Sequence, residues 1–233
     1  MFPLRDDAPR FGTPFITLAL IVVNVAVFIY QFWLAIESPG AQQTFVETFG
    51  AIPLRAEQAL AGGYPLIEGI GPVFTSIFLH GGWLHLIGNM WFLWIFGDNV
   101  EDELGHFAYL LFYLACGLLA SLAHILANPE SMVPAVGASG AIAGVMGAYL
   151  VRFPSARITT LVWIFVFITT IELPAVLMLV YWFAIQFFSG AAETGGAGTG
   201  GVAWWAHVGG FVAGAVLIWL RPRRRRYRKA YYY

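Results

Sequence analysis

Long apolar segments constrain what this chain can fold into more than any other feature. They cover residues 15–36, 83–97, 106–127, 139–151, 157–190 and 202–220. Hydrophobic residues make up 59% of the chain and charged residues 11%, whereas about a quarter of the residues in soluble domains are charged. An α-helix of about 20 apolar residues crosses the hydrocarbon core of a bilayer. The sequence therefore predicts an all-α integral membrane protein.

The fifth apolar run fits either one span plus a shallow segment or two spans broken around Glu172 and Pro174. Basic residues decide between these alternatives, because they collect on the cytoplasmic side of membrane proteins. With six spans and a cytoplasmic N-terminus, every Lys and Arg except Arg55 falls inside, whereas seven spans would move the Arg-rich tail outside. We therefore predict a six-helix bundle with both termini cytoplasmic. The fifth span then covers residues 174–190, and residues 158–172 form an apolar segment buried at the inner side.

The limits of the spans predict three parts of the chain. Residues 1–14 form a short cytoplasmic N-terminus, residues 15–220 the transmembrane domain and residues 221–233 a basic cytoplasmic tail. The first apolar run lacks the basic region and cleavage site of a signal peptide, so we expect it to stay in the protein. The tail could instead bind nucleic acid, but a basic block directly after a span is far more often a topology determinant. We expect lipid contact and no nucleic-acid partner.

The connecting segments follow from the same assignment. Residues 37–76 are predicted as a long outer loop rich in Gly and Pro, and residues 98–105 as a short acidic inner turn. Residues 128–138 return outside, and the Gly-rich residues 189–201 form a flexible outer loop. The single cysteine, Cys116, lies in an apolar run and is expected to be a small buried residue.

Polar residues gather at the start of the second, fourth and sixth apolar segments: His80, His85 and Asn89, then Ser139, then His207. His85 and Asn89 are four residues apart, so they lie on one helix face, where hydrogen bonding between helices is one explanation. However, spans two, four and six all begin at the outer face. Four of these residues, His85, Asn89, Ser139 and His207, therefore converge on one layer in the outer half of the membrane, which indicates a functional site.

Small residues surround Ser139 and His207 in rows that match helix periodicity. The rows are Ser139, Ala143 and Gly147; Gly140, Gly144 and Ala148; and Ala206, Gly210 and Gly214. Taken alone, Ser139 also suits a packing position. Such rows let two helices approach closely. If the fourth and sixth spans pack together, Ser139 and His207 come within hydrogen-bond reach.

Three motifs resemble those of the rhomboid family of intramembrane serine proteases. They are HGGWLHLIGN at residues 80–89, GASG at 137–140 and AHVGGFVAG at 206–214, in the family's order and on its second, fourth and sixth spans. GDNVEDELG, with Gly97, Glu101 and Gly105, is similar to the family's structural turn after the second span. The chain resembles the compact six-helix bacterial form.

The resemblance implies a role for each site residue. Ser139 would be the nucleophile, and His207 the general base and later the acid; a neutral imidazole can accept the hydroxyl proton. The side chains of His85 and Asn89, with the backbone amide of Ser139, would form the oxyanion hole. Packing roles are expected for Gly137, Gly140, Gly144, Gly210, Gly214 and Glu101. No cofactor or metal is implied.

The implied activity is cleavage of single-pass transmembrane proteins at a site open to the extracytoplasmic side of the cell membrane. The 189–201 loop would act as a mobile cap and the fifth span as a lateral gate. The alternative is a catalytically silent rhomboid-like protein that binds membrane proteins for quality control. A transporter is a weaker alternative, because its candidate ionisable groups, Glu172 and His124, are isolated.

Two positions depart from the family pattern. Ala143 stands where a well-characterised relative has an aromatic residue that stacks on the histidine, so a Trp or Phe of a neighbouring helix is expected to hold His207. The Trp-Arg pair that many relatives carry in the first outer loop is absent from residues 37–76.

Overall fold

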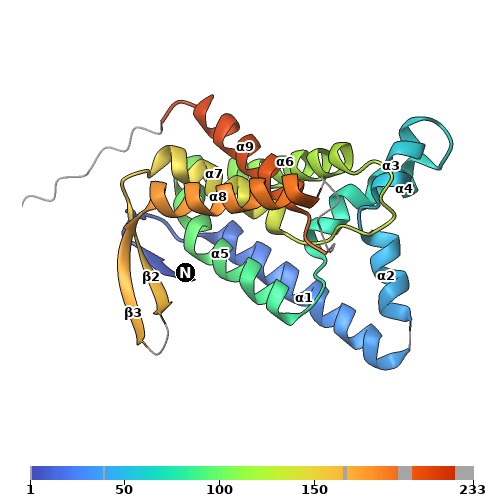
Figure 1. The fold of residues 1–233 in the computed structure, drawn as a ribbon, viewed down its shortest axis with the longest axis horizontal. Coiled ribbons are helices and arrows are strands. Elements are labelled where there is room, and N and C mark those ends of the chain that lie inside the picture. The colour runs from blue at the N-terminus through green and yellow to red at the C-terminus, as the bar shows by residue number, and fades with distance from the viewer. Residues whose placement is uncertain (1, 39, 165–166, 194–200, 224–233) are drawn as a thin grey trace, which may run out of the picture.

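The computed structural model describes residues 2–38, 40–164, 167–193 and 201–223. Its long helices are α1 (Phe15–Glu37), α5 (Trp83–Leu104), α6 (His106–Ala127), α7 (Ser139–Arg152), α8 (Ala175–Ala192) and α9 (Trp204–Trp219) (Figure 1). Each of these helices begins within two residues of the start of a predicted span. The start of a continuous apolar run therefore marks the start of each helix. The described part of the chain is mostly helical.

Three of these helices, α1, α6 and α8, are long and apolar enough to cross a membrane. A fourth span arises if α5 and the helical segment Leu66–Phe78 before it, bent by 74° relative to each other, count as one. Helix α9 is apolar but shorter. Several membrane-crossing helices indicate a multi-pass membrane protein. The count of six spans stays a prediction.

A three-stranded antiparallel sheet corrects the prediction of an all-α chain. Its strands are β1 (Phe2–Asp6), β2 (Arg157–Ile164) and β3 (Phe167–Pro174), in the order β1-β2-β3. Residues 158–172 are therefore not a buried apolar segment: Ile158 and Thr160 are buried, but Ile168 and Ile171 are exposed. β-Branched residues favour the strands, and pairing within the hairpin satisfies their backbone groups.

Two predicted loops are also wrong. Residues 37–76 contain three short helices, α2 (Ala41–Phe49), α3 (Pro53–Leu60) and α4 (Leu66–Thr75), and the 3₁₀ helix η1 (Ser76–Phe78) follows. These helices lie at the opposite end of the molecule from the sheet (Figure 1). The acidic segment 98–105 is not an inner turn, because α5 continues to Leu104 and the chain turns at Gly105, with φ of 81°.

Glu101 explains why the acidic residues stay helical. Its carboxylate is buried and accepts hydrogen bonds from the backbone N–H groups of Ile16 and Thr17, at 2.9 and 2.8 Å, and from the Thr17 hydroxyl at 2.7 Å. The first N–H groups of a helix have no partner within the helix, so Glu101 caps α1. His106 Nδ1 lies 2.6 Å from the same carboxylate.

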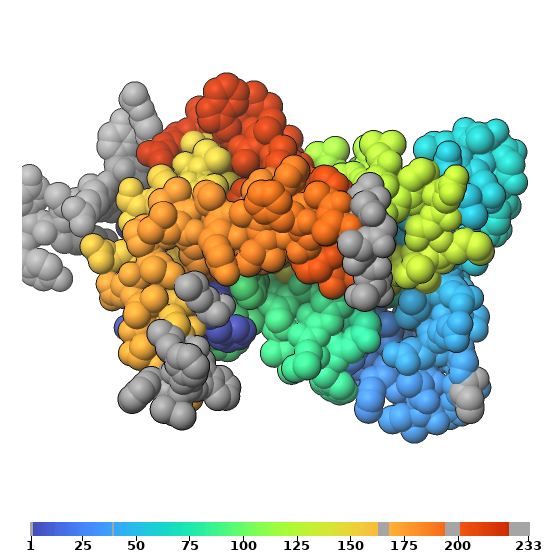
Figure 2. Space-filling model, viewed as in Figure 1, coloured from blue at the N-terminus to red at the C-terminus, as the bar shows by residue number. Residues whose placement is uncertain are grey.

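Helices α7 and α9 pack backbone against backbone. A Cβ atom added to Gly214 would overlap the carbonyl oxygen of Gly144, and one added to Gly210 would overlap that of Gly140. The other side of Gly144 faces the buried Cys116 of α6. Helix α7 is consequently buried from Gly140 to Tyr149, while α8 lies at the surface in front of it (Figures 1 and 2).

We expect Gly214→Ala to lower the free energy of unfolding by about 1–3 kcal/mol, because the added methyl forces α7 and α9 apart. Thermal unfolding in detergent measures this. Gly71→Ala on α4 is the matched control, since nothing lies within 4 Å of a Cβ at that position. Equal melting temperatures for the two variants would show that the α7–α9 contact is not tight.

Candidate active site

The turn before α7 sets the position of Ser139. Gly137 has φ of 129°, a conformation that favours glycine, and a Cβ there would collide with the ring of His85. Its N–H donates to the carbonyl oxygen of Ser76 at 2.9 Å. The chain then enters α7, and Ser139 is its first residue. The serine therefore sits at a helix N-terminus, where backbone N–H groups lack helical partners.

Ser139 and His207 form a direct hydrogen bond. Ser139 Oγ lies 2.8 Å from His207 Nε2, although the residues are 68 positions apart in the chain. Ser139 begins α7 and His207 lies in the first turn of α9, so the close packing of these two helices brings the side chains together.

Helix α8 supplies a residue that the sequence analysis did not single out. Gln186 Oε1 lies 2.7 Å from His207 Nδ1, and Gln186 Nε2 donates to the backbone carbonyl oxygen of Trp182 at 3.4 Å. Gln186 is an amide side chain within the apolar run of α8, a pattern that usually marks function inside a membrane helix. That signal was present in the sequence.

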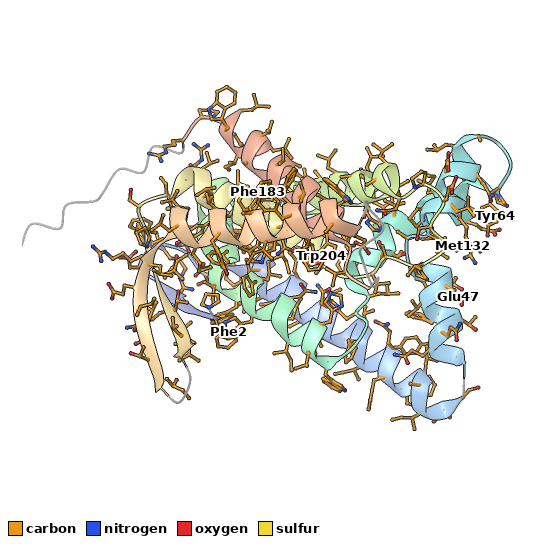
Figure 3. All side chains as sticks on the ribbon, in the orientation of Figure 1. Phe2, Glu47, Tyr64, Met132, Phe183 and Trp204 are labelled. Carbon is orange, nitrogen blue, oxygen red and sulfur yellow. The ribbon has the colours of Figure 1, made fainter. Side chains whose placement is uncertain are left out.

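Two tryptophans contact the ring of His207. The Trp182 ring centroid is 5.8 Å away with an interplanar angle of 38°, and that of Trp204 is 6.3 Å away at 88°. Trp182 of α8 matches the expected aromatic residue from a neighbouring helix, given Ala143, which is itself buried, whereas Trp204 belongs to the same helix as His207. Figure 3 labels Trp204 of α9 and Phe183 of α8.

His85 and Asn89 lie one turn apart on α5 and face the same cavity as Ser139. Asn89 is buried, and within the described part of the chain its Nδ2 has no hydrogen-bond partner. His85 Nδ1 accepts a hydrogen bond from the backbone N–H of Gly81 at 3.3 Å. A neutral imidazole carries one proton, so this bond places the ring N–H of His85 on Nε2. His80 is buried behind His85, with ring centroids 5.2 Å apart.

The dyad, Gln186, His85 and Asn89 line one cavity of about 840 Å³. Its walls come from α5, α7, α8 and α9 and from residues 201–203 just before α9. Most of the lining is apolar, including Phe92, Ile142 and Met146, and the polar groups are concentrated at one place. This size and character suit an organic ligand or a short peptide segment. Most of the predicted cap, residues 194–200, lies outside the described residues.

The remaining candidates lie away from this cavity. Glu172 is exposed on β3 and pairs with Arg157 at 3.6 Å, and His124 contacts Asn128 at the end of α6. The described ranges contain no group of three or more His, Cys, Asp or Glu side chains that could hold a metal ion.

Comparison with known proteins places the chain in a family. Residues 69–224 match the Rhomboid domain. The rhomboid protease GluP of Bacillus subtilis (strain 168) is 30% identical over 210 residues, which is 88% of this chain and 35% of that protein. The human mitochondrial presenilin-associated rhomboid-like protein is 28% identical over 187 residues, 76% of this chain and 44% of that protein. RHOMBOID-like protein 5 of Arabidopsis thaliana is 33% identical over 155 residues, 65% of this chain and 45% of that protein.

The chain spans less than half the length of each of these relatives. The Rhomboid domain nevertheless covers more than half of this chain, including Ser139 and His207. The protein therefore belongs to the rhomboid family, which includes intramembrane serine proteases.

Proposed function

We propose that the protein is a serine endopeptidase of the cell membrane that cleaves transmembrane proteins with the dyad Ser139 and His207. The observation that carries this proposal is the 2.8 Å hydrogen bond between Ser139 Oγ and His207 Nε2 at the wall of a largely apolar cavity. A hydroxyl within reach of an imidazole is the arrangement that activates a serine nucleophile.

Each half of the reaction moves one proton through His207: the hydroxyl proton in acylation and a proton of water in deacylation. His207 Nε2 accepts the hydroxyl proton as Oγ attacks the scissile carbonyl carbon. The imidazolium then gives this proton to the leaving amine, the C–N bond breaks and an acyl-enzyme remains. Water attacks the acyl group, His207 takes its proton, and Oγ regains that proton as the ester bond breaks.

The oxyanion of the tetrahedral intermediate needs hydrogen-bond donors that are in place beforehand. Asn89 lines the cavity, and its Nδ2 is a donor without a partner among the described residues. The ring N–H that we assign to His85 Nε2 and the backbone N–H of Ser139 complete the proposed set. The positive end of the α7 dipole adds to the same stabilisation.

The substrate class follows from the cavity and from the chemistry of helices. Carbonyl groups within a helix are already hydrogen-bonded, so a transmembrane substrate must unwind locally before Ser139 can attack. Small or helix-breaking residues near the cleavage site assist this step. Because residues 201–203 and α8 border the cavity, the 189–201 loop remains our candidate cap and α8 our candidate lateral gate.

Charge supports an orientation with both termini in the cytoplasm. Arg10 pairs with Asp98, and Arg152 donates a hydrogen bond to the backbone near the end of α9. Arg157 is the first residue of β2, which pairs with β1. These basic residues gather at the sheet end of the molecule. The positive-inside rule assigns that end to the cytoplasm, so the starts of α5, α7 and α9 would face the extracytoplasmic side.

The dyad predicts a clear loss of activity in two single variants. We expect purified wild-type protein to cleave a designed single-pass transmembrane substrate, and Ser139→Ala or His207→Ala to lower the rate by about 10⁴-fold or more. Gel analysis of the products measures the rate. Equal cleavage by all three proteins would refute the dyad. Wild-type protein that binds the substrate without cutting it would favour the quality-control alternative.

The oxyanion hole predicts a loss confined to catalysis. We expect Asn89→Ala to lower kcat about 10²- to 10³-fold with little change in KM, because the donor acts on charge that develops in the transition state. Asn128→Ala is the control, since Asn128 lies at the end of α6 and contacts His124 instead of the cavity. Unchanged kcat in Asn89→Ala would remove Asn89 from the site.

A further inference from the structure

We infer that Gln186 is the positioning residue of the dyad, and that through it the placement of α8 determines whether His207 can act as a base. The inference rests on the proposed function and extends it to a residue of the helix beside the cavity. The evidence is a continuous set of hydrogen bonds that links α8, α9 and α7.

The direction of these bonds is fixed by the amide of Gln186. Its Nε2 donates to the carbonyl oxygen of Trp182, which can only accept. The amide oxygen Oε1 therefore faces His207 Nδ1 at 2.7 Å, and an oxygen acceptor requires an N–H on Nδ1. A neutral imidazole carries one proton, so Nε2 keeps its lone pair and accepts from Ser139 Oγ. This is the tautomer that a general base needs.

The aromatic neighbours of His207 cannot make this selection. Trp182 and Trp204 contact the ring and limit its rotation. Neither contact determines whether the ring proton is on Nδ1 or on Nε2. Among the described side chains, Gln186 and Ser139 are the two that hydrogen-bond to the His207 ring. Gln186 is 6% exposed, so water competes little for this bond. The selection of the tautomer therefore rests on Gln186.

The position of Gln186 ties the dyad to α8. Helix α8 lies at the surface of the bundle (Figure 2). Its exposed side chains include Leu177, Tyr181 and Phe188. A displacement of about 1 Å lengthens the 2.7 Å contact beyond an effective hydrogen bond. An outward shift of α8 thus removes the acceptor from His207, and its return restores the active tautomer.

Gln186→Leu tests the positioning role, because leucine keeps the approximate volume and removes the acceptor. We expect kcat for a transmembrane substrate to fall about 10- to 100-fold with little change in KM. Labelling of Ser139 by a small fluorophosphonate, which does not need a helix to pass α8, slows by a similar factor. Gln43→Leu on α2 is the matched control, since Gln43 pairs with Glu47.

Gln186→Glu tests the same role without loss of the acceptor. It retains far more activity than Gln186→Leu. The added carboxylate favours the imidazolium, so the acidic limb of its pH–rate profile moves to higher pH. A wild-type profile in Gln186→Glu, or wild-type kcat in folded Gln186→Leu, would overturn the inference. In either case loss of activity in Ser139→Ala would leave the proposed function intact, whereas cleavage by Ser139→Ala would refute the function itself.

A double-mutant cycle tests the link to α8. Phe183 of α8 contacts Phe211 of α9, with ring centroids 4.9 Å apart, and neither residue lines the cavity. Phe183→Ala loosens this contact and slows phosphonate labelling. If α8 acts through Gln186, Phe183→Ala slows it no further in a Gln186→Leu background. Additive effects would refute the link.

Discussion

The close approach of α7 and α9 is the contact on which the rest of the site depends. It is possible because the facing positions, Gly140, Gly144, Gly210 and Gly214, have no side chains, so the backbone of one helix lies against the carbonyl oxygens of the other. In a membrane, where lipid and protein interiors are equally apolar, such close packing is a main source of helix association. The same contact brings Ser139 and His207 to 2.8 Å.

The polar side chains of the dyad are tolerated inside the bundle because they hydrogen-bond to one another and to α8. Hydrogen bonds run from the Ser139 hydroxyl to His207, from His207 to Gln186 and from Gln186 to the Trp182 backbone. An unpaired polar group in such surroundings costs roughly 1–3 kcal/mol. Asn89 Nδ2 is one of the buried polar atoms without a partner within the described residues, and Asn89 lines the cavity, where a developing negative charge requires a donor.

Much of the helical framework could be predicted from the sequence. The apolar runs gave the starts of the long helices, and the small-residue rows indicated the pairing of α7 with α9. The hairpin of β2 and β3 was missed because an apolar run alone does not distinguish a strand from a shallow helix. Its pairing with β1 joins segments about 150 residues apart, beyond the reach of any local pattern.

At the site, the spacing of His85 and Asn89 and the Ser139 and His207 motifs singled out four residues that line one cavity. Gln186 was missed because the fifth apolar run was interpreted through its charges, and a neutral amide does not enter that argument. The end of α5 was placed too early because acidic residues suggest a turn, whereas Glu101 is buried as the cap of α1. Both errors concern polar side chains whose partners lie on another helix.

The most direct test of the account is to map the covalent adduct of a fluorophosphonate on the purified protein. Mass spectrometry should find a single adduct, on Ser139, and the His207→Ala variant should not form it, because without the imidazole the hydroxyl is not activated. An adduct on another residue, or equal labelling of Ser139 without His207, would contradict the central claim that α7 and α9 build a catalytic dyad.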